Sequence, residues 1–138
     1  VDFRDMVEAV LEAKELYELL YLGVDAHLAD TLTPQLQDAG VQVISISQTM
    51  VGMSPAMKEI ERMLRGREML HVHNTCARWC FGNVRCAVDG NENTKPMKDR
   101  SIGRIDITVA WVIAVAAWLV YRAQHPFDTT KLKEDWSL

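Results

Sequence analysis

The stretch that decides the fold class runs over residues 19–47 and reads LLYLGVDAHLADTLTPQLQDAGVQVISIS. Its first part, LLYLGVDA, is an apolar run without helical periodicity that ends abruptly at Asp25. Such a run, followed by turn signals, favours a buried and typically parallel strand. AHLADTLTPQLQDAG predicts a helix closed by Gly40, a residue that tolerates the left-handed cap, with Pro34 as a kink or as the true first turn. VQVISIS alternates and predicts a second strand.

An amphipathic helix precedes this strand–helix–strand unit. Its apolar stripe follows helical spacing, with acids and a lysine on the other face. The order helix, strand, helix, strand indicates an α/β sheet with right-handed crossovers. The stripe consists of Phe3, Met6, Val7, Val10 and Leu11.

The elements after residue 47 are shorter. Ser54-Pro55 predicts the start of a helix, with the hydroxyl at the cap and the proline in the first turn. We expect a short strand at 68–72 (EMLHV) and a helix at 74–84 (NTCARWCFGNV). The stretch 84–100 reads as a strand that leads into a polar, turn-rich excursion.

The last long helix lies within RSIGRIDITVAWVIAVAAWLVYR, residues 100–122. A membrane span needs about 20 apolar residues, and runs of about 10–14 are more often buried helices. The fifteen residues 107–121 fall between these lengths, and we interpret them as a core helix and not as a membrane span. Its small-residue face is expected to lie close against a sheet. That face holds Asp106, Ala110, Ala114 and Ala117.

Composition limits the class of protein. The chain has 138 residues, the length of one domain, and a net charge of −4, which argues against a surface coated in basic residues. A local basic patch remains compatible with nucleic-acid binding. Three cysteines indicate a reduced, intracellular compartment. The start, VDFRDMVEAV, lacks the features of a secretory signal, so we expect a protein that is not secreted, and we expect Val1 to be a cut inside a longer chain.

Two carboxylates stand at element ends. Asp25 follows a predicted parallel strand and Asp106 precedes the last helix. Each has a plain structural explanation, because acids cap helices and favour their first turn. However, ligands of open α/β sheets bind at the carboxyl ends of the strands, and two carboxylates that converge there would hold hard cations such as Mg²⁺. Phosphodiester hydrolysis with paired metal ions is the chemistry that such a site suits.

A second possible metal site uses softer ligands. His71, His73, Cys76 and Cys80 lie close in sequence, with Cys86 beyond them. Zinc prefers such ligands, but the spacing lacks the paired pattern of structural zinc sites. Buried cysteines that act as small hydrophobic residues are the ordinary alternative.

Basic residues cluster just before Asp106. Lys and Arg contacts to phosphate dominate nucleic-acid affinity, so these residues are candidates for DNA binding, and a solvated loop is the alternative. No phosphate-binding Gly-rich loop occurs anywhere in the chain, which removes an NTPase site from consideration. The cluster consists of Lys95, Lys98, Arg100 and Arg104.

An ordered series of residues resembles a known family. From Leu19 to Ala117 the chain looks like the C-terminal nuclease domain of the large terminase subunit of tailed phages or prophages. The Gly-Gly and Pro usual around the His-Asn motif are replaced by Val72, His73 and Thr75, so we expect the local loop to differ. The matching residues are Gln48, Met53-Ser54-Pro55, His71, Asn74, Arg78, Trp79, Asn83, Lys98, Ser101 and Ile105-Asp106.

The resemblance implies an RNase H-like α/β fold that cuts double-stranded concatemeric DNA during genome packaging with two Mg²⁺ or Mn²⁺ ions. It makes Asp25 and Asp106 the catalytic metal ligands, in a partial nuclease domain over 1–122 that is followed by a C-terminal tail over 123–138. The implied partners are double-stranded DNA, the portal, the small terminase subunit and an upstream ATPase domain. The implied setting is the host cytoplasm, with no membrane.

The family's first catalytic Asp lies on a strand that we find nowhere before the first helix. We therefore expect an incomplete fold that lacks its first antiparallel strands, and a chain that is inactive or weak by itself. The alternative function is a non-catalytic interaction module that docks on the portal or the small subunit.

Overall fold

The computed structural model describes residues 3–69 and 73–126 as an alternation of helices and short strands. The first four elements follow the predicted order, which confirms an α/β fold. In chain order the elements are α1 (Phe3–Leu16), β1 (Leu22–Asp25), α2 (Ala26–Asp38), β2 (Val43–Ile46), α3 (Met50–Gly66), α4 (Thr75–Asn83), β3 (Cys86–Val88), β4 (Thr94–Pro96) and α5 (Asp106–Gln124).

The stretch 19–47 forms the expected parallel unit. β1 pairs with β2 in parallel, with a register that runs from Leu22 opposite Val43 to Asp25 opposite Ile46. Helices α1 and α2 close a small apolar cluster on this unit. Gly40 has a φ of 72°, the left-handed conformation predicted for the end of the helix. Pro34 lies inside α2 and does not mark its first turn.

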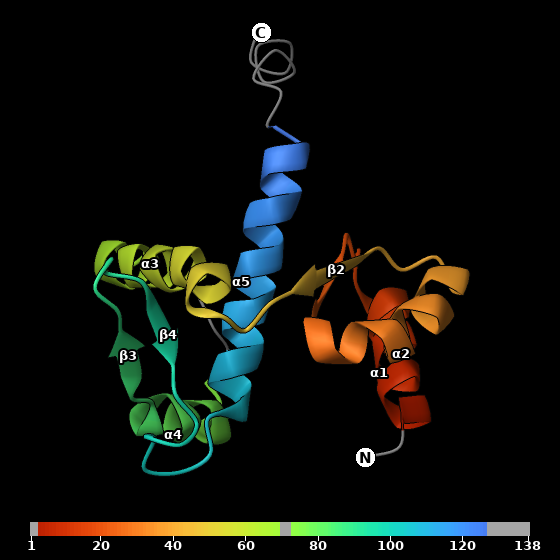
Figure 1. Cartoon of the computed structure of the whole chain (residues 1–138). Coiled ribbons are helices and arrows are strands. Elements are labelled where there is room, and N and C mark those ends of the chain that lie inside the picture. The colour runs from red at the N-terminus through yellow and green to blue at the C-terminus, as the bar shows by residue number, and fades with distance from the viewer. Residues whose placement is uncertain (1–2, 70–72, 127–138) are drawn as a thin grey trace, which may run out of the picture.

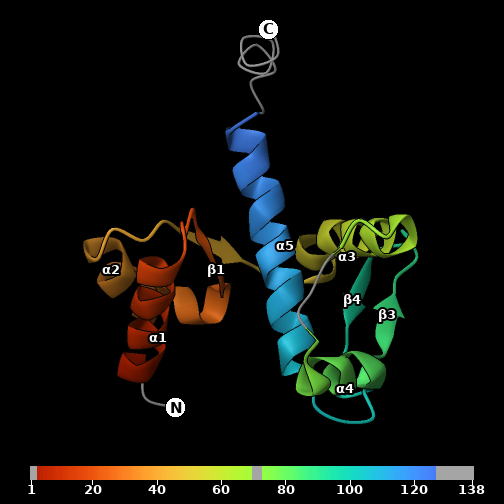
Figure 2. The same ribbon diagram turned by 180° about the vertical axis from the view of Figure 1, so that it is seen from behind.

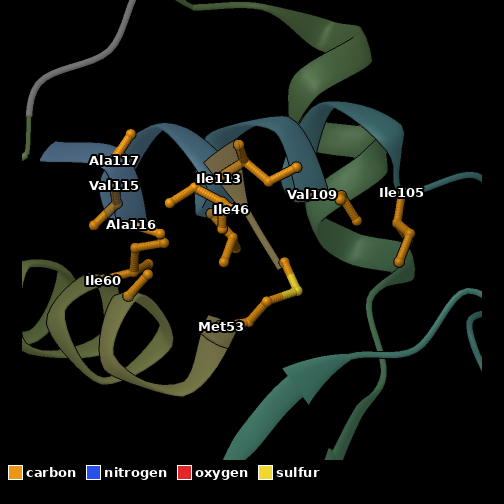
Figure 3. Close-up of a cluster of buried hydrophobic side chains, with 11 residues drawn as sticks. Ile46, Met53, Ile60, Ile105, Val109, Ile113, Val115, Ala116 and Ala117 are labelled. Atoms are coloured by element: carbon orange, nitrogen blue, oxygen red, sulfur yellow. The ribbon is translucent and has the colours of Figure 1, made fainter. Parts of the chain in front are cut away.

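Helix α5 forms the centre of the molecule. In both views it stands between the β1–β2 unit with α1 and α2 on one side, and α3, α4 and the β3–β4 hairpin on the other (Figures 1 and 2). Side chains of α5 make up most of the larger apolar core, together with residues of β2 and α3 (Figure 3). By length and composition α5 is apolar enough to cross a membrane, but seven of its residues are buried in this core, as in a core helix.

The predicted alanine face of α5 is only partly correct. Ala117 is fully buried against β1, whereas Ala110 and Ala114 are exposed. The larger side chains Val109, Val112 and Ile113 face inward instead, and their burial stabilises the fold more than burial of alanines would. These residues therefore set the rotation of the helix.

Helix α3 begins five residues before the predicted start. Thr49 is its N-cap, and the Thr49 side chain accepts a hydrogen bond from the Gly52 N–H. Ser54, which we expected at the cap, is 2% exposed inside the helix, and its Oγ accepts a hydrogen bond from the Thr94 N–H at 3.1 Å. The hydroxyl therefore anchors β4 to α3 and does not cap the helix.

The segment 84–100 contains one strand more than predicted. β3 pairs with β4 in an antiparallel hairpin, with Ala87 opposite Lys95. Strands of three residues are too short to show alternation in a sequence, so the second strand was missed. Of the strand predicted at 68–72, Glu68 and Met69 are not in a strand, and the rest lies outside the described residues.

Candidate functional site

Asp25 is the last residue of β1 and the N-cap of α2. Its Oδ1 accepts a hydrogen bond from the His27 N–H at 3.1 Å, and its Oδ2 accepts one from Gln48 Nε2 at 2.5 Å. The side chain is half-buried at the carboxyl end of the parallel strands. Asp25 thus has the capping role that the plain structural reading predicted, and it also lies at the edge of the sheet where ligands bind in α/β folds.

Gln48 joins this edge to the β3–β4 hairpin. It follows β2, so its side chain reaches Asp25 while its main-chain carbonyl accepts a hydrogen bond from Lys95 Nζ at 3.1 Å. Lys95 belongs to β4, and the hairpin therefore brings an ammonium group to the end of the parallel sheet. The sequence pattern included Gln48 without indicating that it contacts Asp25.

Asp106 is the first residue of α5, and it has different neighbours. Lys98 Nζ lies 3.2 Å from Oδ1, and Arg104 Nη1 lies 4.0 Å from Oδ2. All three side chains are mostly exposed. Two of the four residues predicted to bind DNA thus form ion pairs with the second predicted metal ligand.

The remaining predicted DNA-binding residues divide between the two acids. Lys95 lies on the Asp25 side, through Gln48. Arg100 is exposed in the loop 97–105 that leads from β4 to α5. This loop carries three of the four basic residues directly in front of Asp106.

Helix α5 packs directly on β1, the strand that ends in Asp25. The approach is close at Gly23, where an added Cβ would lie 2.9 Å from Ala117 Cβ and 2.9 Å from the Ile113 carbonyl oxygen. Only a residue without a side chain permits this contact. The fold therefore carries one acid on each of two elements that pack against each other, with lysines beside both.

Comparisons with known proteins identify the family. A family model described as the terminase large subunit, endonuclease domain, matches residues 10–121, which is most of the chain. The chain belongs to this family.

A curated relative and a solved structure resemble the same region. Protein YmfN of Escherichia coli strain K12 is 29% identical over 126 residues, which cover 90% of this chain and 28% of that protein. The crystal structure of the HK97 bacteriophage large terminase superposes with a TM-score of 0.77 at 24% identity, over 85% of this chain and 25% of that one. This likeness shows an RNase H-like fold. The terminase endonuclease domain seen here spans about a quarter of the length of each of these relatives.

The softer ligands of the terminase endonuclease domain are dispersed. Cys80 is buried, whereas Cys76 and Cys86 are exposed, and His71 lies outside the described residues. Within residues 3–69 and 73–126 no group of three or more His, Cys, Asp or Glu side chains is placed to hold a metal ion. Burial of Cys80 agrees with the reading of a small hydrophobic residue.

Sequence reasoning missed how firmly the loop before Asp106 is held in the terminase endonuclease domain. Ser101 Oγ donates to the Met97 carbonyl at 2.6 Å and accepts from the Arg85 N–H at 3.1 Å. Asn83, at the end of α4, accepts from the Ile102 N–H at its carbonyl and donates from Nδ2 to the Arg104 carbonyl, both at 3.2 Å. The sequence indicated only a polar, solvated loop here. The match of Asn83 and Ser101 to the family pattern was the available signal.

Proposed function

We propose that this domain is the nuclease of a DNA-packaging terminase and cuts double-stranded DNA with Asp25 and Asp106 as metal ligands. The observation that carries the proposal is the direct packing of α5, which begins with Asp106, on β1, which ends with Asp25. Membership of the terminase endonuclease family supports nuclease activity. The position of Asp25 at the carboxyl end of parallel strands supports a role in ligand binding.

The donor chemistry fits Mg²⁺ or Mn²⁺. Carboxylate and amide oxygens are hard ligands, and Asp25, Asp106 and the Gln48 amide supply them. Gln48 now donates through Nε2, and a rotation of its amide group would present the oxygen instead. When bound, divalent ions activate water and stabilise the leaving oxygen of the phosphodiester.

The basic side chains have two roles in this proposal. In this structure Lys98 and Arg104 neutralise Asp106 through ion pairs. We expect a divalent ion to replace them at the carboxylate, which frees both side chains to contact DNA phosphates. Lys95 and Arg100 complete the proposed phosphate-binding set.

Several further proposals concern the whole protein. We propose two metal ions. In the family that the sequence resembles, a first catalytic Asp on another strand joins the acids that match Asp25 and Asp106, so these two carboxylates are too few to close such a site. Further acids from other parts of the protein would complete it, and this chain alone would be inactive or weak. We further propose an ATPase domain upstream, contacts to the portal and the small subunit, concatemeric DNA as substrate, and action in the host cytoplasm. The division into a domain over 1–122 and a tail over 123–138 stays a prediction.

A non-catalytic docking module is the second candidate. It is favoured by the fact that both acids already have structural partners, Asp25 as the cap of α2 and Asp106 in two ion pairs. Titration of the chain with Mn²⁺ in a calorimeter separates the two candidates. The nuclease proposal expects binding heat that Asp106→Asn removes, and a flat wild-type trace favours the docking module.

The decisive experiment is cleavage by the whole terminase that carries Asp106→Asn. Loss of a metal ligand removes several kcal/mol of transition-state stabilisation, so we expect cleavage to fall by about a hundredfold or more. Asp99→Asn is the matched control, because Asp99 is exposed in the same loop and has no assigned role. Both variants should keep the wild-type unfolding temperature. Full cleavage by Asp106→Asn would show that Asp106 is not a ligand.

A further inference from the structure

The loop 97–105 presents an exposed apolar side chain among charged residues. Ile102 in this loop is 73% exposed. It lies between Arg100 and Arg104, and Lys98 is in the same loop. Figures 1 and 2 both show the loop at the end of the molecule where α4 meets the start of α5, and Ile102 precedes Asp106 by four residues in the sequence.

Exposure alone does not assign a role, because single exposed aliphatic side chains are common on protein surfaces. Leu16, at the end of α1, is 67% exposed without a comparable set of cations. Ile102 differs from it in two respects. Its backbone is fixed, and an arginine stands two residues away on either side of it, Arg100 and Arg104, of which Arg104 pairs with Asp106.

The fixed backbone follows from contacts on both sides of Ile102. The Ile102 N–H donates to the Asn83 carbonyl, and Ser101 is tied to Met97 and Arg85. On the other side, Gly103 lies against Trp79, and a Cβ on Gly103 would be 3.2 Å from Trp79 Cζ2 and 2.7 Å from Asn83 Nδ2. A loop held in this way loses less backbone entropy when Ile102 binds a partner.

We propose that Ile102 is a wedge that enters the minor groove of duplex DNA and partly unstacks a base step next to the cleavage position. Proteins that bend DNA through the minor groove insert apolar side chains between base pairs and place arginines beside them. The cations of the loop would contact phosphates beside the groove. Unstacking weakens the duplex locally and kinks it toward the major groove. The proposal rests on DNA as the substrate of the proposed nuclease.

The test compares Ile102→Ala with Leu16→Ala in the 138-residue chain. The probe is a short duplex that carries a fluorescent adenine analogue, whose emission rises when it unstacks. We expect wild type and Leu16→Ala to bind equally and to raise the emission. Ile102→Ala should bind about tenfold more weakly, because less apolar surface is buried, and should leave the emission low.

The salt dependence of DNA affinity distinguishes an inserted apolar side chain from a phosphate contact. Ile102→Ala should keep the wild-type slope of log affinity against log salt, whereas Arg100→Gln should lower it by about 0.9 for the lost contact. The wedge is wrong if Ile102→Ala has a reduced slope, or if this variant keeps both the affinity and the emission of wild type. Binding that a minor-groove drug does not weaken overturns the assignment to that groove.

The outcomes also distinguish failure of the wedge proposal from failure of the nuclease proposal. Asp106→Asn removes the ion-pair partner of Lys98 and Arg104, so it should bind DNA at least as tightly as wild type. It should also raise the emission, since Asp106 acts in the proposed chemistry and not in unstacking. If Ile102→Ala is neutral while Asp106→Asn stops cleavage in the whole terminase, only the wedge is wrong. If the wild-type chain does not bind the duplex, the wedge and the proposed DNA contacts of this loop are both wrong.

Discussion

Asp25 and Asp106 are carboxylates at the ends of adjoining elements, yet they are held in different ways. Asp25 is half-buried and accepts hydrogen bonds from two neutral donors, the His27 N–H and the Gln48 amide. Asp106 is exposed and faces two cations, Lys98 and Arg104. The N-cap residue before it, Ile105, makes no side-chain capping bond.

The difference teaches what each region contributes. Asp25 belongs to the framework, because it satisfies backbone and side-chain donors that would otherwise lose a partner. Asp106 contributes little to stability, because exposed ion pairs are worth about 1 kcal/mol or less. An acid whose partners are so weakly held is available to another cation.

The largest effect is expected where the two regions join. Gly23→Ala would place a Cβ against the Ile113 carbonyl, and because that atom is backbone, the strand or the helix must shift. We expect a loss of about 1–3 kcal/mol in the free energy of unfolding, measured by urea denaturation. Gly82→Ala is the control, since a Cβ on Gly82 meets nothing within 4 Å. Equal stability of the two variants would contradict the close packing of α5 on β1.

Substitution of Asp25 and of Asp106 should have smaller effects on stability, and the two effects should differ. Asp25→Ala removes an N-cap and should cost about 1 kcal/mol, whereas Asp106→Ala removes only a favourable charge in the first turn and exposed ion pairs, and should cost about 0.5 kcal/mol or less. Unfolding of both variants in urea at low ionic strength measures the difference. If Asp106→Ala is the more destabilised of the two, the comparison of their roles is wrong.

The smallest effect concerns Asp89 in the turn of the β3–β4 hairpin, which is held by neutral donors as Asp25 is. The hydrogen bond from the Asn93 side chain, and then the one from the Asn93 N–H, lower the pKa of Asp89. A lowered pKa means that the carboxylate stabilises the fold above the unfolded pKa of about 3.9 and that this contribution is lost as the pH falls through the folded pKa.

Asp89→Asn keeps an oxygen acceptor and removes the charge. The difference in unfolding temperature between wild type and this variant should therefore be constant above about pH 5 and shrink below about pH 4. Thermal unfolding across that range measures it. A difference that stays the same in acid would show that the charge of Asp89 is not what stabilises the turn.

Prediction from the sequence succeeded where a pattern extends over several residues. The stripe of α1 and the alternation around β2 each repeat a period, and the apolar run of β1 is continuous up to Asp25. It failed at Ser54, because Thr49 offered an equally good cap five residues earlier and only the contact of Ser54 with Thr94 distinguishes the two. It also failed for β4, whose three residues show no period.

Of the candidate site, the sequence could indicate the residues and not their partners. Asp25 and Asp106 were chosen because of their places at element ends, and Lys98 and Arg104 because of their charge. That Lys98 pairs with Asp106, and that Gln48 links Asp25 to Lys95, depends on how distant segments meet. No local pattern encodes such contacts.

The sequence by itself determined the alternation of helices and strands, the apolar core helix and the membership of a terminase endonuclease family, because these depend on local periodicity and on ordered motifs. Only the tertiary structure decided which face of α5 is buried, since large side chains at Val109, Val112 and Ile113 compete with alanines for the interior. It also decided that the loop before Asp106 is held firmly, because those hydrogen bonds join the loop to Asn83 at the end of α4 and to Arg85 before β3, which are separate from it in the sequence.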